Sequence, residues 1–248
     1  MHISNAQFLN LLYRRYILFL KLLFQNRKMK SLLFDPSISG VSGDMILAVL
    51  ADEKKLRELE NLLSEFKVKL SFERIEKGHT LCSRLKIKIG NEKHFRNFDE
   101  LRAATKKILA KRKKEKEFVF KVFKIIENAE LAVHGEIHGL HELGSVDTLI
   151  DVIGAAISLP KGKKIYSLPI AVGSAAPAVL EIAKQNKVPL FFKKNPHELA
   201  TPTGAAILAA SASFVRKTFM PLSIKYSTGT FPIPGYLRLM EVDDNAKK

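Results

Sequence analysis

Residues 140–156, LHELGSVDTLIDVIGAA, combine metal-ligating side chains with an apolar segment. His141, Glu142, Asp147 and Asp151 fall within eleven positions, and the last two lie inside the apolar run. Carboxylates at the start of a buried helix cost free energy unless a cation or a hydrogen-bond donor pairs with them. This segment is therefore the first candidate for a metal or substrate site.

Three histidines, His134, His138 and His141, follow one another at spacings of four and three. In a helix they would share one face with Glu130 and Glu142. Imidazole suits nickel, zinc and copper, and carboxylates can complete the coordination shell. Three glycines interrupt the segment, so a loop that carries ordinary surface histidines is equally compatible with it.

Asp147 and Asp151 are four residues apart, a spacing that puts both carboxylates on one helix face. Side by side they repel each other unless a cation or a donor lies between them. One hypothesis is a functional acidic pair. The alternative is that Asp147 caps the helix while Asp151 pairs with a lysine.

Two small-residue motifs resemble helix starts that can bind anions. In SISGVSGD, Ser42 or Asp44 can cap a helix, although the motif lacks the signatures of a P-loop and of a dinucleotide-binding fold. In ATPTGAA, the hydroxyls of Thr201 and Thr203 and the N–H of Gly204 can hold an anion. The alternative for this second motif is a simple cap with close packing of small residues.

The elements that must position these residues alternate between strand and helix patterns. The mixture predicts an α/β (mixed α+β) fold with a layered sheet and flanking helices, and a soft domain boundary near residues 90–97. The patterns predict strands over 31–34, 67–76, 83–89, 164–168, 188–192, 222–226 and 236–242. They predict helices over 45–50, 54–66, 98–110, 118–134 and 177–185, one from 145 or 147 to about 159, and one after ATPTG.

The chain of 248 residues has a net charge of +16 and one cysteine, Cys82. The single cysteine excludes an internal disulfide and is typical of a small buried residue. Positive charge concentrates in residues 1–30 and 106–124. Solvated helix faces explain such runs, and the sequence has no zinc finger, helix-turn-helix or RNP-like strand. A nucleic-acid partner is therefore not expected, although binding to nucleic acid or to a membrane surface remains the second alternative.

Residues 1–28 form an apolar and basic extension. Arg14, Arg15 and Lys21 break its apolar run, which falls short of a membrane span and lacks a signal cleavage site. It could be an amphipathic helix on a membrane surface. We expect instead that translation starts at Met29 and that the extension lies outside the fold.

Six motifs occur in a fixed order: MKSLLFDPSISGVSGDM, HFRNFDELR, AVHG, LHELGSVDTLIDVIGAA, ATPTGAAIL and YSTG…LRLMEV. From Met29 to about Val242 the chain resembles the LarC family of nickel-insertion proteins. The resemblance implies a cytoplasmic nickel insertase, a lyase that puts nickel into pyridinium-3,5-bisthiocarboxylic acid mononucleotide and so makes the nickel-pincer nucleotide of lactate racemase. It also implies CTP hydrolysis with Mn or Mg.

Carried over to this sequence, the resemblance and the ligand chemistry give three groups of candidate residues. A protein that hands nickel on needs exchangeable nitrogen and oxygen ligands. The expected metal ligands are His134, His138, His141, Glu142 and Asp151, and the expected catalytic residues are Asp35, Asp44 and Asp147. The expected cofactor-binding residues are Ser42, Gly43, Thr201, Thr203 and Gly204.

The chain also departs from the family pattern. Gly139 stands where the family usually has a histidine, and a stretch after LPIAVGS is missing. The family continues into a CTP-binding domain that we expect to be absent here, so the chain would be one part of a split enzyme whose partner supplies that domain. Alternatives are a non-catalytic nickel-binding or storage protein and a degenerate member. A homo-oligomer is expected.

Overall fold

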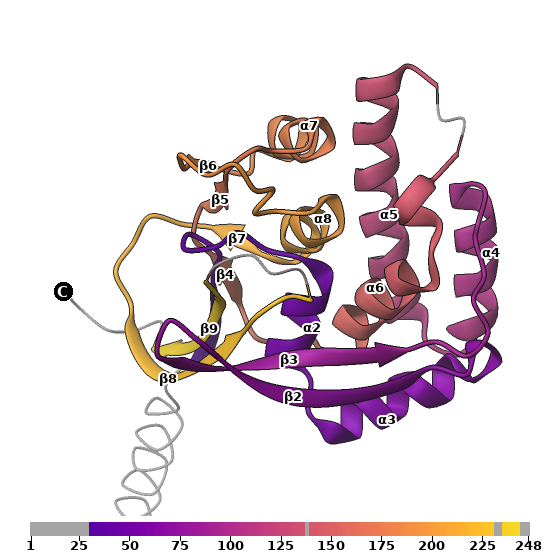
Figure 1. The fold of residues 1–248 in the computed structure, drawn as a ribbon, viewed down its shortest axis with the longest axis horizontal. Helices are drawn as coiled ribbons and strands as arrows, with labels where there is room; N and C mark the ends of the chain where they lie inside the picture. Colours follow the sequence, from indigo (N-terminus) through magenta and orange to yellow (C-terminus); the bar gives the residue numbers. More distant parts are fainter. Residues whose placement is uncertain (1–29, 137–138, 231–234, 244–248) are drawn as a thin grey trace, which may run out of the picture.

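The computed structural model describes residues 30–136, 139–230 and 235–243 (Figure 1). The predicted extension, residues 1–28, lies outside them, as does Met29. The described residues form a mixed sheet with helices packed on one side of it, which confirms the predicted α/β class. No helix within these ranges is long and apolar enough to cross a membrane.

A seven-stranded sheet has the order β2-β3-β8-β9-β1-β4-β7. The β2–β3, β8–β9 and β9–β1 pairs are antiparallel, whereas β3–β8, β1–β4 and β4–β7 are parallel. A separate parallel pair consists of β5 (Ile170–Val172) and β6 (Leu190–Phe192). The strands of the large sheet are β1 (Lys30–Asp35), β2 (Lys69–Lys77), β3 (Thr80–Lys88), β4 (Ile165–Ser167), β7 (Ser213–Phe214), β8 (Met220–Ser227) and β9 (Leu237–Asp243).

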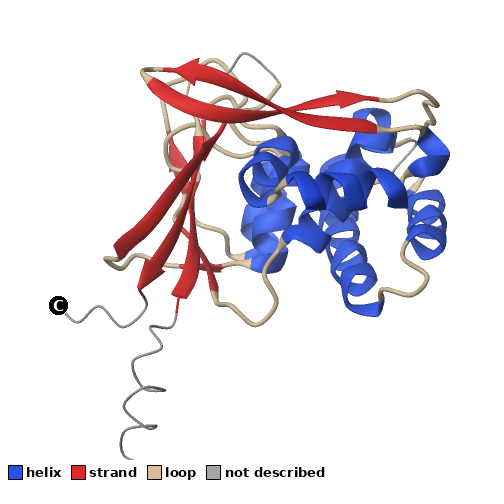
Figure 2. Ribbon diagram, turned by 90° about the horizontal axis from the view of Figure 1, so that it is seen from below, coloured by secondary structure: helices blue, strands red, loops and turns tan. Residues whose placement is uncertain are grey.

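The helices gather on the concave side of the curved sheet (Figure 2). Their apolar faces build one core with the inner face of the sheet, and burial of these side chains is the main stabilising contribution. They are α2 (Gly43–Leu50), α3 (Glu53–Leu62), α4 (Phe98–Ile108), α5 (Lys113–His134), α6 (Val146–Ser158), α7 (Pro177–Asn186) and α8 (Pro202–Ser211), with 3₁₀ turns at Ser64–Phe66 and His141–Gly144.

Most expected elements are present, with a few differences. The predicted helix over 54–66 is α3 followed by a separate 3₁₀ turn, and α5 begins five residues before the predicted start. Strand β3 begins three residues before the predicted start at residue 83, so Cys82 is a buried residue of this strand, and the turn before it consists of Gly78 and His79. The boundary near residues 90–97 stays a prediction.

Candidate functional site: an acidic cluster at two helix starts

Helices α2 and α6 lie side by side with their N-termini at the same end. Two glycines show how closely they approach. A Cβ at Gly154 of α6 would lie 2.7 Å from the Leu47 side chain of α2, and a Cβ at Gly43 of α2 would overlap the Asp151 side chain of α6. This contact brings together Asp44 and Asp147, each in the first turn of its helix, and Asp151, one turn further along α6. We call these three residues the acidic cluster.

Asp44 is held firmly in the first turn of α2. Its Oδ1 accepts hydrogen bonds from the Ser42 hydroxyl and, at 2.8 Å, from the backbone N–H of Met45. Its Oδ2 accepts two more, each 2.8 Å long, from the N–H and the hydroxyl of Thr230. Ser42 occupies the N-cap position of α2, but its hydroxyl donates to Asp44 and makes no cap hydrogen bond.

Asp151 is the least compensated acid of the cluster. Its Oδ1 is buried, and no hydrogen-bond partner for it exists among the described residues. Burial raises the pKa of Asp151 well above its ordinary value, and the charges of Asp44 and Asp147 raise it further. The predicted alternative, a pairing of Asp151 with a lysine, is therefore wrong.

Asp147 lies in the first turn of α6, where Ser145 occupies the N-cap without a side-chain cap bond. Partial burial raises its pKa, and the charges of Glu92 and Asp44 act in the same direction. The predicted common face of Asp147 and Asp151 is therefore present, and it points toward a third acid on another helix. Asp147 and Asp151, whose pKa values are raised, form with the neighbouring carboxylate of Asp44 an environment that a divalent cation would stabilise.

The ATPTG motif starts helix α8, which packs against the loop that leads into α2. The Thr201 hydroxyl accepts a 3.2 Å hydrogen bond from the N–H of Gly204 and so caps α8. A Cβ at Gly204 would lie 2.6 Å from the carbonyl oxygen of Val41, so α8 packs directly on the loop before α2. Thr203 is buried. These contacts match the alternative of a cap with close packing, and binding of a cofactor by Thr201, Thr203 and Gly204 stays a prediction.

Asp35 is buried at the end of β1 and is fully paired. Its Oδ1 accepts from the N–H and hydroxyl of Ser37, and its Oδ2 accepts from Nε of Arg238, at 2.9 Å, and from Nη2 of the same residue. Its carboxylate therefore anchors the loop that leads to Ser42 and Gly43. A catalytic role for Asp35 stays a prediction.

His134 and His141 do not share a helix face. Helix α5 ends at His134, where Gly135 adopts a φ of +74°, and His141 has a φ of +43° in a 3₁₀ turn. Exposed His134 lies 3.4 Å from Glu130, and the His141 carbonyl oxygen lies 2.8 Å from Nε2 of His94. His138 and the side chain of Glu142 lie outside the described parts of the chain. Metal binding by these four residues stays a prediction.

No group of three or more His, Cys, Asp or Glu side chains within the described ranges could hold a metal ion by itself. Nickel bound at the acidic cluster would therefore need further ligands from water, from a substrate or from residues beyond the described ranges.

Two residues at the site were missed in the sequence. Thr230 donates two hydrogen bonds to Asp44, and its position directly after the YSTG motif was the available signal. Glu92 influences Asp147 from the loop after β3. It carried no recognisable signal, because only the folded chain brings residue 92 near α6.

Comparison with known proteins places this arrangement in a family. The family "Nickel insertion protein" matches residues 32–248. Proteins named "Putative nickel insertion protein" are 34% identical in Wolinella succinogenes (87% of this chain, 61% of the relative) and 33% identical in Methanosarcina acetivorans (84% and 57%). A third, from Methanothrix thermoacetophila, is 36% identical over 74% of this chain and 50% of its own length.

The chain spans about three fifths of the length of the first two relatives. No solved structure matches it. The family match covers nearly every described residue, including both helix starts and the strands that hold them. The resemblance seen in the motifs is thus confirmed, and the chain belongs to the nickel insertion protein family.

Proposed function

We propose that this chain holds nickel at the acidic cluster and inserts it into pyridinium-3,5-bisthiocarboxylic acid mononucleotide, as one part of a larger or split enzyme. The observation that carries the proposal is the buried Oδ1 of Asp151, which has no hydrogen-bond partner in the described parts of the chain and lies near the charges of Asp44 and Asp147. A buried carboxylate without a partner is costly, and a divalent cation would offset that cost.

In this proposal the carboxylates bind nickel as a substrate and release it again. Oxygen ligands exchange readily, whereas sulfur ligands of the mononucleotide are softer and favour the transferred metal. The histidines near residue 141 would supply nitrogen ligands from the neighbouring segment. A carboxylate freed from nickel can accept a proton, because the raised pKa of Asp151 favours its protonated form.

CTP hydrolysis with Mn or Mg belongs to the same proposal. The relatives extend beyond the part that they share with this chain. We assign CTP use to that further part, in the same polypeptide or in a partner chain. The proposed setting is the cytoplasm, where the product nucleotide would be used.

Nickel titration calorimetry at neutral pH tests this function. The variant is Asp44→Asn combined with Asp151→Asn, and the control is Asp52→Asn. Asp52 is the exposed N-cap of α3, where asparagine caps equally well, so the control changes charge without touching the cluster. We expect wild type and control to bind nickel and the double variant to bind at least tenfold more weakly.

Equal nickel binding by all three proteins would contradict the proposed site. A second candidate function is nickel storage, because the buried Oδ1 of Asp151 could be compensated by nickel without any acceptor nucleotide. Adding the mononucleotide and CTP with a full-length relative's C-terminal part separates the two functions, because a storage protein would never metallate the nucleotide.

A further inference from the structure

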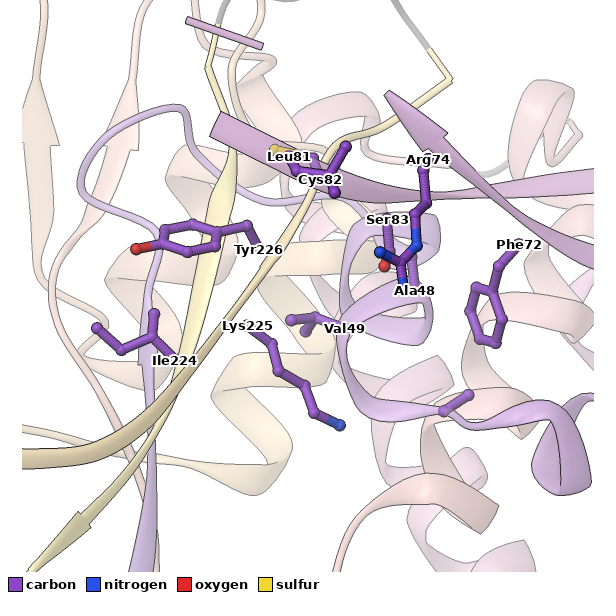
Figure 3. Close-up of a pocket in the computed structure, with 11 residues that line it drawn as sticks. Ala48, Val49, Phe72, Arg74, Leu81, Cys82, Ser83, Ile224, Lys225 and Tyr226 are labelled. Atoms are coloured by element: carbon purple, nitrogen blue, oxygen red, sulfur yellow. The ribbon is translucent and has the colours of Figure 1, made fainter. Parts of the chain in front are cut away.

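The segment that follows β8 lies against the first turn of α2. Strand β8 runs alongside this helix, and Lys225 of β8 and Val49 of α2 line one cavity of about 290 Å³ (Figure 3). Two residues further along the chain, the hydroxyl of Ser227 donates to the Met45 carbonyl oxygen at 2.7 Å. The strand therefore delivers residues 228–230 to the start of α2.

Gly229 and Thr230 complete this contact at Asp44. A Cβ at Gly229 would lie 3.3 Å from the Ser42 hydroxyl and 3.5 Å from Oδ1 of Asp44, so the backbone passes close to the acid. Thr230 donates its backbone N–H and its hydroxyl to Oδ2 of Asp44, each at 2.8 Å. The segment after β8 therefore holds Asp44 from outside its own helix.

These contacts use the whole hydrogen-bonding capacity of the Asp44 carboxylate. An ionised carboxylate has about four lone-pair sites, which are shared by its two oxygens. Ser42 and Met45 donate to Oδ1, and Thr230 donates twice to Oδ2. A metal ion that binds Asp44 must therefore displace at least one of these donors.

Asp151 is in the opposite condition. Its buried Oδ1 has no hydrogen-bond partner among the described residues, so a metal ion can bind there without displacing a donor from this part of the chain. Of the donors to Asp44, Ser42 and Met45 belong to the same turn as the acid. Thr230 is an exposed residue 186 positions away, and its contact is the one that can open without unwinding α2.

We propose that Thr230 competes with nickel for Asp44, so that Asp44 is an exchangeable ligand and Asp151 a fixed one. Nickel that arrives at the acidic cluster displaces the Thr230 hydroxyl from Oδ2 of Asp44. When the metal passes to its acceptor, Thr230 pairs with Asp44 again and so favours release. Thr230 is thus a positioning residue that weakens nickel binding and promotes transfer. This role rests on the proposed function, because it concerns nickel at the acidic cluster.

Nickel titration calorimetry on Thr230→Val tests the competition. Valine has nearly the shape of threonine but no hydroxyl, so it removes one of the two donors to Oδ2 of Asp44. We expect this variant to bind nickel at least about threefold more tightly than wild type, because a hydrogen bond to a charged group no longer has to be broken. It should also release nickel more slowly when excess EDTA captures the free metal. Thr230→Ser is the matched control, since it keeps the hydroxyl and should behave as wild type.

The same substitution in an Asp44→Asn background shows whether Thr230 acts through Asp44. Asparagine at position 44 lacks the charge for which nickel and Thr230 compete, while Asp151 remains available to the metal. In this background Thr230→Val should leave nickel affinity unchanged, so the effects of the two substitutions should not add. A purely structural effect of Thr230→Val on the loop would change nickel affinity by the same factor in both backgrounds.

The outcomes separate this proposal from the proposed function. If wild type binds nickel but Thr230→Val binds it equally or more weakly, the competition is overturned while the nickel site stands. An equal gain in the Asp44→Asn background, or a Thr230→Ser variant that behaves like Thr230→Val, overturns it as well. If neither wild type nor Thr230→Val binds nickel, the proposed function fails and the role of Thr230 fails with it.

Discussion

Gly43 packs directly against the carboxylate of Asp151, and a Cβ at position 43 would overlap that side chain. The first residue of α2 must be a glycine, because the side chain of Asp151 in α6 occupies the space that a Cβ would need. The contact fixes the distance between the two helix starts. It also explains how Asp44, Asp147 and Asp151 can influence one another from two helices.

Gly43→Ala should destabilise the protein by about 1 to 3 kcal/mol, the usual cost of forcing an extra methyl group into a packed site. Urea unfolding followed by circular dichroism measures this. Gly139→Ala is the control, because a Cβ there meets nothing within 4 Å. Equal stabilities of the two variants would show that α2 and α6 are further apart than described.

The free energy of unfolding should change with pH as the buried carboxyl group of Asp151 titrates. Its pKa is raised in the folded state, so its contribution to stability is full below the ordinary value near 4 and is lost as pH rises through the folded value. Asp151→Asn cannot ionise and should lose less stability than wild type as the pH rises from about 4 to neutrality. Thermal unfolding of both proteins across this pH range measures the difference. If the melting temperatures of wild type and variant changed in parallel with pH, the raised pKa of Asp151 would be contradicted.

Nickel affinity should rise with pH over the same range. Metal binding requires ionised carboxylates, so nickel must displace the protons that burial favours on Asp151 and Asp147. Calorimetry in two buffers of different ionisation enthalpy reports the protons released. Binding without proton release at mildly acidic pH would place the nickel ligands elsewhere.

Arg238→Gln should destabilise the protein by about 2 to 4 kcal/mol, because it leaves the buried Asp35 carboxylate without its charged partner. Lys163→Gln, which removes an exposed pairing with Glu241 of the same strand as Arg238, should change stability by less than about 1 kcal/mol. Combining Arg238→Gln with Asp35→Asn should restore part of the loss. No restoration would mean that the two side chains are not coupled.

Cys82 should react slowly in the native protein. Burial raises the pKa of its thiol, so the reactive thiolate is scarce and shielded. A thiol-specific chromogenic reagent should label it at least tenfold faster in denaturing urea than in buffer. The chain has one cysteine, so all labelling comes from Cys82. Rapid labelling of the native protein would contradict the buried position of Cys82 in β3.

The sequence by itself determined the class of fold, most elements and the family. Regular spacing of apolar residues predicted α2, α4, α6 and α7 closely, because helix period and end signals are local properties. The same spacing put Asp147 and Asp151 on one face of α6. The motif order then indicated the nickel insertion family, which the comparisons confirmed.

Only the tertiary structure decided which residues meet. The packing of α2 on α6 brings the charge of Asp44 near Asp151, and the end of α5 at His134 separates this residue from His141, which a continuous helix would have aligned with it. Thr230 reaches Asp44 from 186 positions away, and Arg238 reaches Asp35 from 203. Such pairings depend on strand order and helix docking, and these are set by burial of the whole core rather than by any local stretch of residues.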